Sequence, residues 1–134
     1  MKVNIALLFR ITGAALGVQV ALGGLVTFGF LDPSVHIVWG VVLGALAIVS
    51  LVYVARLSPR PKRLFGLTVG IGVDILLQAL IGFAALRTSG ALSGGIAWIH
   101  LLNAFAIFAM SIMGSGMAIA AGRMTAAPPT AASG

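Results

Sequence analysis

Apolar residues fill most of the chain in four long runs, which are separated by short breaks that contain glycine, proline or charged residues. The runs cover about residues 7–30, 34–56, 64–86 and 95–121. Each run has the roughly 20 residues that a helix needs to cross the hydrocarbon layer of a membrane. The pattern therefore predicts an all-α integral membrane protein, with a bundle of four transmembrane helices in one domain over residues 1–123.

Residues 124–134 differ from the rest of the chain in composition. They are alanine, proline, threonine, serine, methionine and glycine. A segment with so few large apolar side chains cannot bury enough surface to pack. We expect a disordered tail there.

The composition supports a membrane protein. Of the 134 residues, 60% are hydrophobic and 7% are charged, and the mean hydropathy is +1.18. Soluble domains contain about 25% charged residues. The chain has no cysteine, which excludes disulfides, thiolate metal sites and cysteine nucleophiles.

The net charge of +6 arises from basic residues that gather on one side of the predicted spans. Seven of the eight lie there: Lys2, Arg10, Arg56, Arg60, Lys62, Arg63 and Arg123. Only Arg87 lies on the other side. By the positive-inside rule, this placement predicts a multi-pass protein of the cell membrane with both termini in the cytoplasm. It also explains the positive charge without nucleic-acid binding, and Arg10 within the first run favours a span over a signal peptide.

The two halves of the chain resemble each other. Residues 19–23 (QVALG) match residues 78–82 (QALIG), and a histidine follows each segment near the start of the next span, His36 in one half and His100 in the other. We interpret this as a repeated two-helix unit. The two hairpins cover residues 7–56 and 64–121.

The two histidines are expected at similar depth in the membrane. Asp32 and Pro33 have the residue types of a helix N-cap and of the first helical position, so His36 lies about one turn inside the second span. His100 is expected about one turn inside the fourth span. In a bundle whose helices run alternately up and down, the second and fourth helices are diagonal across the core. The two imidazoles then face the same central space.

A histidine in hydrocarbon is unfavourable unless it has a partner. His36 and His100 are the only histidines of the chain, and their matched depth favours axial ligation of one haem iron between them. Gly40 and Ala104 lie on the same helix faces and leave space for such a ligand. Alternatively, each imidazole bonds a backbone carbonyl, and the small residues only allow close helix packing. Zinc fits less well, because a closed zinc site needs four ligands.

Two carboxylates and one arginine are further polar candidates. Asp74 lies in the middle of the third span, with Gln78 one turn further along the helix. We expect a structural role for Asp74, paired with a glutamine or with Arg10, rather than catalysis. Asp32 is explained by its predicted N-cap role.

Several of these segments resemble the heme A synthase family of cytochrome oxidase assembly proteins. The similarity is carried by residues 19–23 with Leu25 and Val26, by residues 78–82 with residues 86–90 (LRTSG), and by His100 with the two leucines that follow it. Members of that family have eight spans in two similar four-helix halves, each with a histidine pair. This chain resembles one such half.

The resemblance implies a four-helix bundle that holds haem b or haem O, with His36 and His100 as the iron ligands and Arg87 near a haem propionate. It implies an oxidoreductase that converts haem O to haem A for cytochrome oxidase assembly, with a homodimer restoring eight spans. The chain departs from the family because it has neither a glutamate before the first histidine nor the cysteine pair. No catalytic residue is assigned.

A second function is compatible with the same histidines, a non-enzymatic b-type cytochrome. Two imidazoles saturate the iron, which suits electron transfer rather than oxygen binding. Such a protein would be a subunit of a respiratory complex, with the other subunits as its partners. A small transporter fits less well, because Asp74 is the only charge in the middle of a predicted span.

Overall fold

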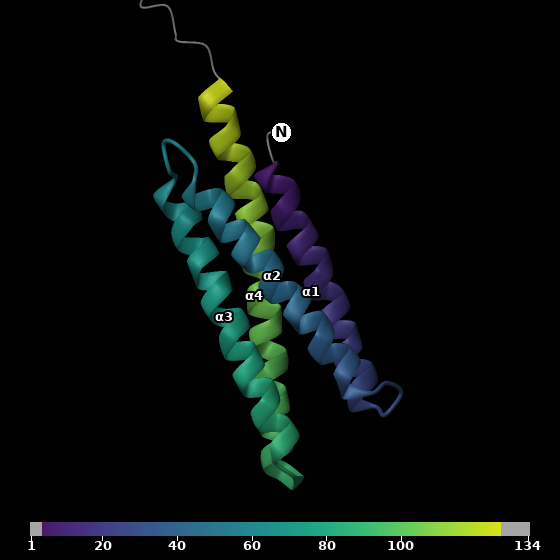
Figure 1. Cartoon of the computed structure of the whole chain (residues 1–134). Coiled ribbons are helices and arrows are strands. Elements are labelled where there is room, and N and C mark those ends of the chain that lie inside the picture. Colours follow the sequence, from purple (N-terminus) through teal and green to yellow (C-terminus); the bar gives the residue numbers. More distant parts are fainter. Residues whose placement is uncertain (1–3, 127–134) are drawn as a thin grey trace, which may run out of the picture.

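The computed structural model describes residues 4–126, with side chains for residues 4–123, and consists of helices without strands over that range. The helices are α1 (Ile5–Thr27), α2 (Pro33–Ala55), α3 (Lys62–Arg87) and α4 (Gly90–Ala126) (Figure 1). All four are long and apolar enough to cross a membrane. The all-α fold with four candidate spans is thereby confirmed. Helix α4 includes residues 124–126 of the predicted tail, and residues 127–134 lie outside the described part.

The helices run alternately up and down (Figure 1). Consecutive helices pack against each other, and α4 also packs against α1, so that α2 lies diagonal to α4 and α1 diagonal to α3. We call the end that carries the start of α1, the α2–α3 loop and the last turns of α4 the terminal end. The opposite end carries the α1–α2 and α3–α4 connections, and we call it the connector end.

Helix α1 ends at Thr27, earlier than the apolar run predicted. The next residues form a capping motif, in which the Phe30 amide donates to the Leu25 carbonyl at 2.9 Å and the Gly29 amide donates to the Val26 carbonyl at 3.0 Å. Gly29 has a φ of 75°, the left-handed conformation that this motif requires and that glycine adopts without strain. The glycine therefore ends the helix even though apolar residues continue.

Helix α2 begins as predicted. Asp32 is its N-cap, and the Asp32 Oδ1 atom accepts a hydrogen bond of 2.8 Å from the Ser34 amide. Pro33 occupies the first helical position, where its missing N–H leaves no hydrogen bond unmade. Asp32 thus has a defined structural role at the connector end.

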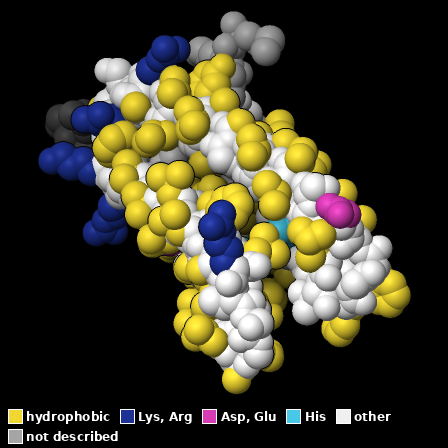
Figure 2. Space-filling model, turned by 60° about the horizontal axis from the view of Figure 1, so that its bottom comes forward, with side chains coloured by type: hydrophobic (Ala, Val, Ile, Leu, Met, Phe, Trp, Pro, Cys, Tyr) yellow, Lys and Arg dark blue, Asp and Glu magenta, His cyan; other side chains and the backbone are white. Residues whose placement is uncertain are grey.

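The buried core lies toward the terminal end. Buried residues stop at Leu16 in α1 and at Ile71 in α3, and they begin at Leu43 in α2 and at Ala104 in α4. The hairpins α1–α2 and α3–α4 diverge toward the connector end (Figure 1). Figure 2 shows a hollow between them with a histidine side chain visible in it. The connector half is therefore the less tightly packed part of the bundle.

Candidate functional site

His36 and His100 meet in the connector half of the bundle, although they come from diagonal helices. The centroids of the two imidazole rings are 5.9 Å apart, and the ring planes are inclined by 59°. Both side chains are half-buried. The structure thus brings the two predicted residues together in one central space.

The predicted position of His100 within its helix was wrong, although the two histidines do lie at similar depth in the bundle. Helix α4 begins at Gly90 rather than near residue 95, so His100 lies about three turns inside its helix, whereas His36 lies about one turn inside α2. Residues 90–94 are helical although they precede the strongly apolar run. Because the two rings are adjacent, the start of α4 extends about two turns beyond the start of α2.

In the first hairpin, Gln19 of α1 contacts both the backbone and the ring of His36. The Gln19 Nε2 atom donates to the His36 carbonyl at 3.1 Å and lies 3.2 Å from His36 Nε2. Gly23 follows one turn later and faces the ring, since a Cβ atom there would lie 3.1 Å from His36 Cε1. The absence of a side chain at Gly23 therefore allows the imidazole to lie against α1.

In the second hairpin, the glutamine bond to the histidine backbone and the glycine beside the imidazole ring recur. Gln78 Nε2 donates to the His100 carbonyl at 2.7 Å, and a Cβ atom at Gly82 would lie 3.0 Å from His100 Cε1. Asn103 adds a further contact, because its Nδ2 atom donates to Gln78 Oε1 at 2.9 Å and to the Asp74 carbonyl at 3.3 Å. Asn103, an amide in the apolar run that follows His100, was not predicted from the sequence as part of the site.

The two imidazoles differ in their hydrogen bonds. An amide NH₂ group only donates, so His36 accepts the bond from Gln19 at Nε2, and the neutral ring then carries its proton on Nδ1. Over the described residues, the corresponding glutamine, Gln78, reaches only the backbone of His100 and neither of its ring nitrogens. The second imidazole is therefore the freer of the two.

Three polar atoms at the site are buried without a hydrogen-bond partner in the described part of the chain. They are Nδ1 of His36, Nδ1 of His100 and Oε1 of Gln19. More than about 90% of buried polar groups in native proteins have a partner. A ligand with polar groups at this cluster would supply partners that these atoms lack within the described part of the chain.

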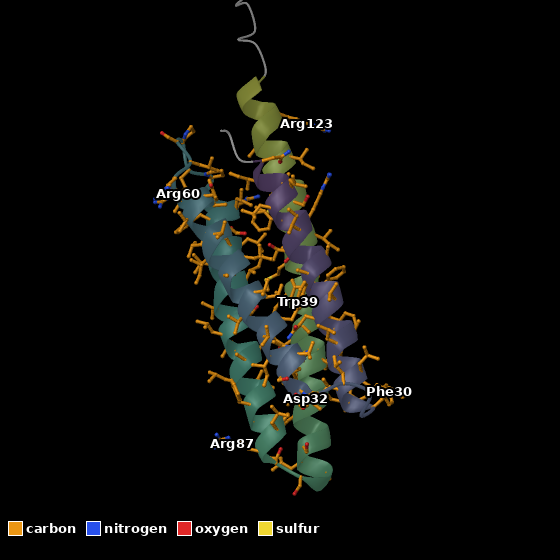
Figure 3. All side chains as sticks on the ribbon, turned by 45° about the vertical axis from the view of Figure 1, so that its right-hand side comes forward. Phe30, Asp32, Trp39, Arg60, Arg87 and Arg123 are labelled. Atoms are coloured by element: carbon orange, nitrogen blue, oxygen red, sulfur yellow. The ribbon has the colours of Figure 1, made fainter. Side chains whose placement is uncertain are left out.

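The other predicted site residues differ in their surroundings. A Cβ atom at Gly40 would lie 3.4 Å from Gln19 Nε2, so Gly40 makes room for the glutamine rather than directly for a ligand. Ala104 is buried at the beginning of the packed part of α4. Arg87 is the last residue of α3 and is exposed at the connector end, where Asp32 also lies (Figure 3).

Arg10, one of the two partners expected for Asp74, does not pair with it. Arg10 donates instead through Nε to Ser115 Oγ at 3.3 Å. The physical reason is the order of the helices, because α1 packs against α4 and lies diagonal to α3, which carries Asp74. Asp32 is exposed, and hydrogen bonds from Ser34 hold the pKa of its carboxyl below the ordinary value.

The number of metal-binding side chains at the site determines how a metal ion could be held there. The described residues contain no group of three or more histidine, cysteine, aspartate or glutamate side chains that could together hold a metal ion. A metal at the two rings therefore fits when a cofactor supplies its other ligands, as the porphyrin of haem does.

Comparisons of the chain with protein-family models, with curated proteins and with solved structures found no match. The fold and the site define a class, a bundle of four membrane-length apolar helices with two facing imidazoles between its hairpins. Any function must account for the two rings and for the buried polar atoms beside them.

Proposed function

We propose that this protein is a multi-pass membrane protein that binds one haem between His36 and His100. The observation that carries the proposal is the meeting of two half-buried imidazoles from diagonal helices, with ring centroids 5.9 Å apart, because histidine imidazoles are common ligands of haem iron. The divergence of the hairpins at the connector end supports access for a large flat ligand. Haem b and haem O share the iron porphyrin that these rings would recognise.

Four residues of the chain would orient the two ligands. Gln19 and Gln78 donate to the backbone carbonyls of the histidines, and Gly23 and Gly82 lie against the imidazole rings. The hydrogen bonds hold the histidine backbones, and the glycines leave space beside the helix for each ring, so these contacts would limit the orientations that the imidazoles adopt. His36 Nε2 becomes available to iron only when the Gln19 amide turns from it, and the His36 carbonyl remains as a partner for that amide.

The resemblance to heme A synthases supports an enzymatic role for the haem, the oxidation of haem O to haem A for cytochrome oxidase assembly. The eight spans of that family support a homodimer of this chain. The matching contacts of the two glutamines and the two glycines support the duplication of a two-helix unit. The residues that would carry out the oxidation are not assigned.

A specific observation favours a second function, a b-type cytochrome that passes electrons to subunits of a respiratory complex. Asp32 is used as the N-cap of α2, and Asp74 lies one turn before Gln78 and takes part in the site through its backbone carbonyl. No carboxylate of the described residues hydrogen-bonds to either imidazole. Two axial imidazoles without a neighbouring acid suit electron transfer, in which the haem supplies a redox-active iron without an open coordination position.

The charge distribution supports the proposed orientation in the cell membrane. Arg60 and Arg123 lie at the terminal end, whereas Asp32 and Arg87 lie at the connector end (Figure 3). The excess of basic residues at the terminal end supports cytoplasmic termini.

Optical spectroscopy of the purified chain tests haem binding. The wild-type protein, expressed with a haem supply, should show a Soret band, and His36→Ala and His100→Ala should each lose most of it. Ile37→Ala is a matched control, because Ile37 is exposed next to His36 on α2. Added imidazole should partly restore the band in His36→Gly. A wild-type protein without bound haem, or two histidine variants with unchanged spectra, contradicts the proposal.

Pigment extraction separates the two activities. The chain is co-expressed with a source of haem O, and the extracted haems are identified by mass. Conversion to haem A that disappears in His36→Ala supports the enzyme. Haem that is retained and reversibly reduced, with haem O unchanged, supports the cytochrome.

A further inference from the structure

A second feature of the protein lies away from the histidines, in a groove between α1 and α4. The groove has a volume of about 500 Å³ and is open at the side of the bundle. Its walls are mainly apolar and include Phe108 and Ile112, with small residues such as Gly116 forming the depression. Its one charged lining residue is Arg10. The groove thus combines an apolar surface with a single cation.

The charge of Arg10 is not neutralised by an acidic side chain. Its side chain is exposed, and Nε donates to Ser115 Oγ, a neutral group, at 3.3 Å. The chain has only two carboxylate side chains. Asp32 lies at the connector end, and Asp74 lies on α3, which is diagonal to α1. An anion that partners Arg10 must therefore come from outside the bundle.

We propose that this groove binds an anionic phospholipid, with the phosphate on the Arg10 guanidinium and an acyl chain along the apolar walls. Arg10 lies in the second turn of α1, about 8 Å from the start of the helix, which is near headgroup depth at the terminal end. A guanidinium suits a phosphate because its N–H groups donate in a planar fork. Basic sites between transmembrane helices bind lipid headgroups in this way.

A second copy of the chain is a poorer occupant than a lipid. In a copy of the same orientation, Asp32 would lie at the far end of the bundle from Arg10. An anionic phospholipid supplies both an anion for Arg10 and an apolar acyl chain that matches the apolar walls of the groove. This inference does not depend on haem, because the groove and the histidines lie in different halves of the bundle.

Competition between two lipids tests the proposal. The full chain in detergent is titrated with phosphatidylglycerol and with phosphatidylcholine, and bound lipid is counted by native mass spectrometry. The wild-type protein should prefer phosphatidylglycerol. Arg10→Gln should bind phosphatidylglycerol about tenfold more weakly, as expected when a charged hydrogen bond is lost. Arg123→Gln is the matched control, because it removes a basic residue of the same end outside the groove, and it should keep the preference.

Filling the groove tests the acyl-chain part separately. A Cβ atom at Gly116 meets no atom within 4 Å, so Gly116→Leu places its side chain into open space. This variant should keep its helix content and lose bound phosphatidylglycerol. Equal binding of the two lipids by the wild-type protein overturns the proposal, as does the same loss in Arg10→Gln and Arg123→Gln. A dimer that dissociates in Gly116→Leu also overturns it, because the groove would then be an interface between copies.

Discussion

Gln78 and His100 are joined by a 2.7 Å hydrogen bond from the glutamine amide to the histidine backbone carbonyl. The bond ties α3 to α4 at the depth of the imidazole ring. Because little water competes for hydrogen bonds among packed apolar side chains, such a contact helps to fix the relative position of two helices. The position of His100 therefore depends on α3 as well as on its own helix.

Replacing Gln78 should loosen the second hairpin. Gln78→Leu keeps the side-chain volume but removes the bond to His100 and the acceptor of Asn103. We expect the free energy of unfolding in detergent to fall by about 1–2 kcal/mol, since each such bond contributes roughly 0.5–1.5 kcal/mol. Leu80→Ala, on the exposed face of α3, is the control. A Gln78→Leu protein as stable as the control would contradict this role.

The helices could be predicted where neighbouring residues in the sequence alone determine that a helix forms or where it begins. Length and apolar character alone predict four helices, and the residue types of Asp32 and Pro33 predict the start of α2. The end of α1 was harder to predict from the sequence, because apolar residues continue past Thr27. The helix ends there because Gly29 adopts a left-handed conformation. The start of α4 was missed because residues 90–94 are helical without being strongly apolar.

The candidate site was predictable in its histidines and less so in their neighbours. The repeated glutamine and histidine were recognised as matching positions of the two hairpins, but the hydrogen bonds between them were not predicted. Asn103 was missed because its contact with Gln78 depends on how α3 and α4 are rotated about their axes. The same limitation explains Arg10, since the helix order places it beside Ser115 rather than beside Asp74.

Adding one methyl group at Gly82 should displace the ring of His100. A Cβ atom there would lie 3.0 Å from His100 Cε1, closer than an ordinary contact. Gly70→Ala on the same helix is the control, since its Cβ meets nothing within 4 Å. The control should be neutral or more stable by up to about 1 kcal/mol, because alanine favours helices over glycine. Gly82→Ala should not gain this stability, and nuclear magnetic resonance should show a shifted resonance of the His100 ring. Equal gains in both variants contradict the contact.

Acid should weaken the cap of α2. Hydrogen bonds from Ser34 lower the pKa of Asp32 in the folded chain below its ordinary value of 3.8. The unfolded chain then binds more protons near this pH, so stability rises with pH. The stability that the ionised Asp32 side chain contributes is fully present above about pH 3.8, the ordinary pKa. This stability is lost as the pH falls through the lower pKa of Asp32 in the folded chain. Asp32→Asn keeps a capping side chain without titrating. Its unfolding temperature should therefore lack the acid-dependent decrease that the wild-type protein shows.

The packing of α1 on α4 can be tested at two glycines that are two positions apart in α4. A Cβ atom at Gly114 would lie 2.6 Å from Phe9 Cδ1, whereas one at Gly116 meets nothing within 4 Å. Phe9 is only 1% exposed and belongs to the core, so its ring cannot move without disturbing neighbouring side chains. Gly114→Ala should lower the free energy of unfolding by about 1–2 kcal/mol, the net of overpacking and improved helix propensity.

The double variant shows whether that loss arises at Phe9. Gly116→Ala, the control, should be neutral or slightly stabilising. Combining Gly114→Ala with Phe9→Leu should cost less than the sum of the two single changes, because the smaller side chain removes the clash. Additive losses would show that the two residues do not meet and that α1 and α4 pack in another register. Because Arg10 and Ser115 follow these residues directly in sequence, the same result would also displace the groove between the two helices.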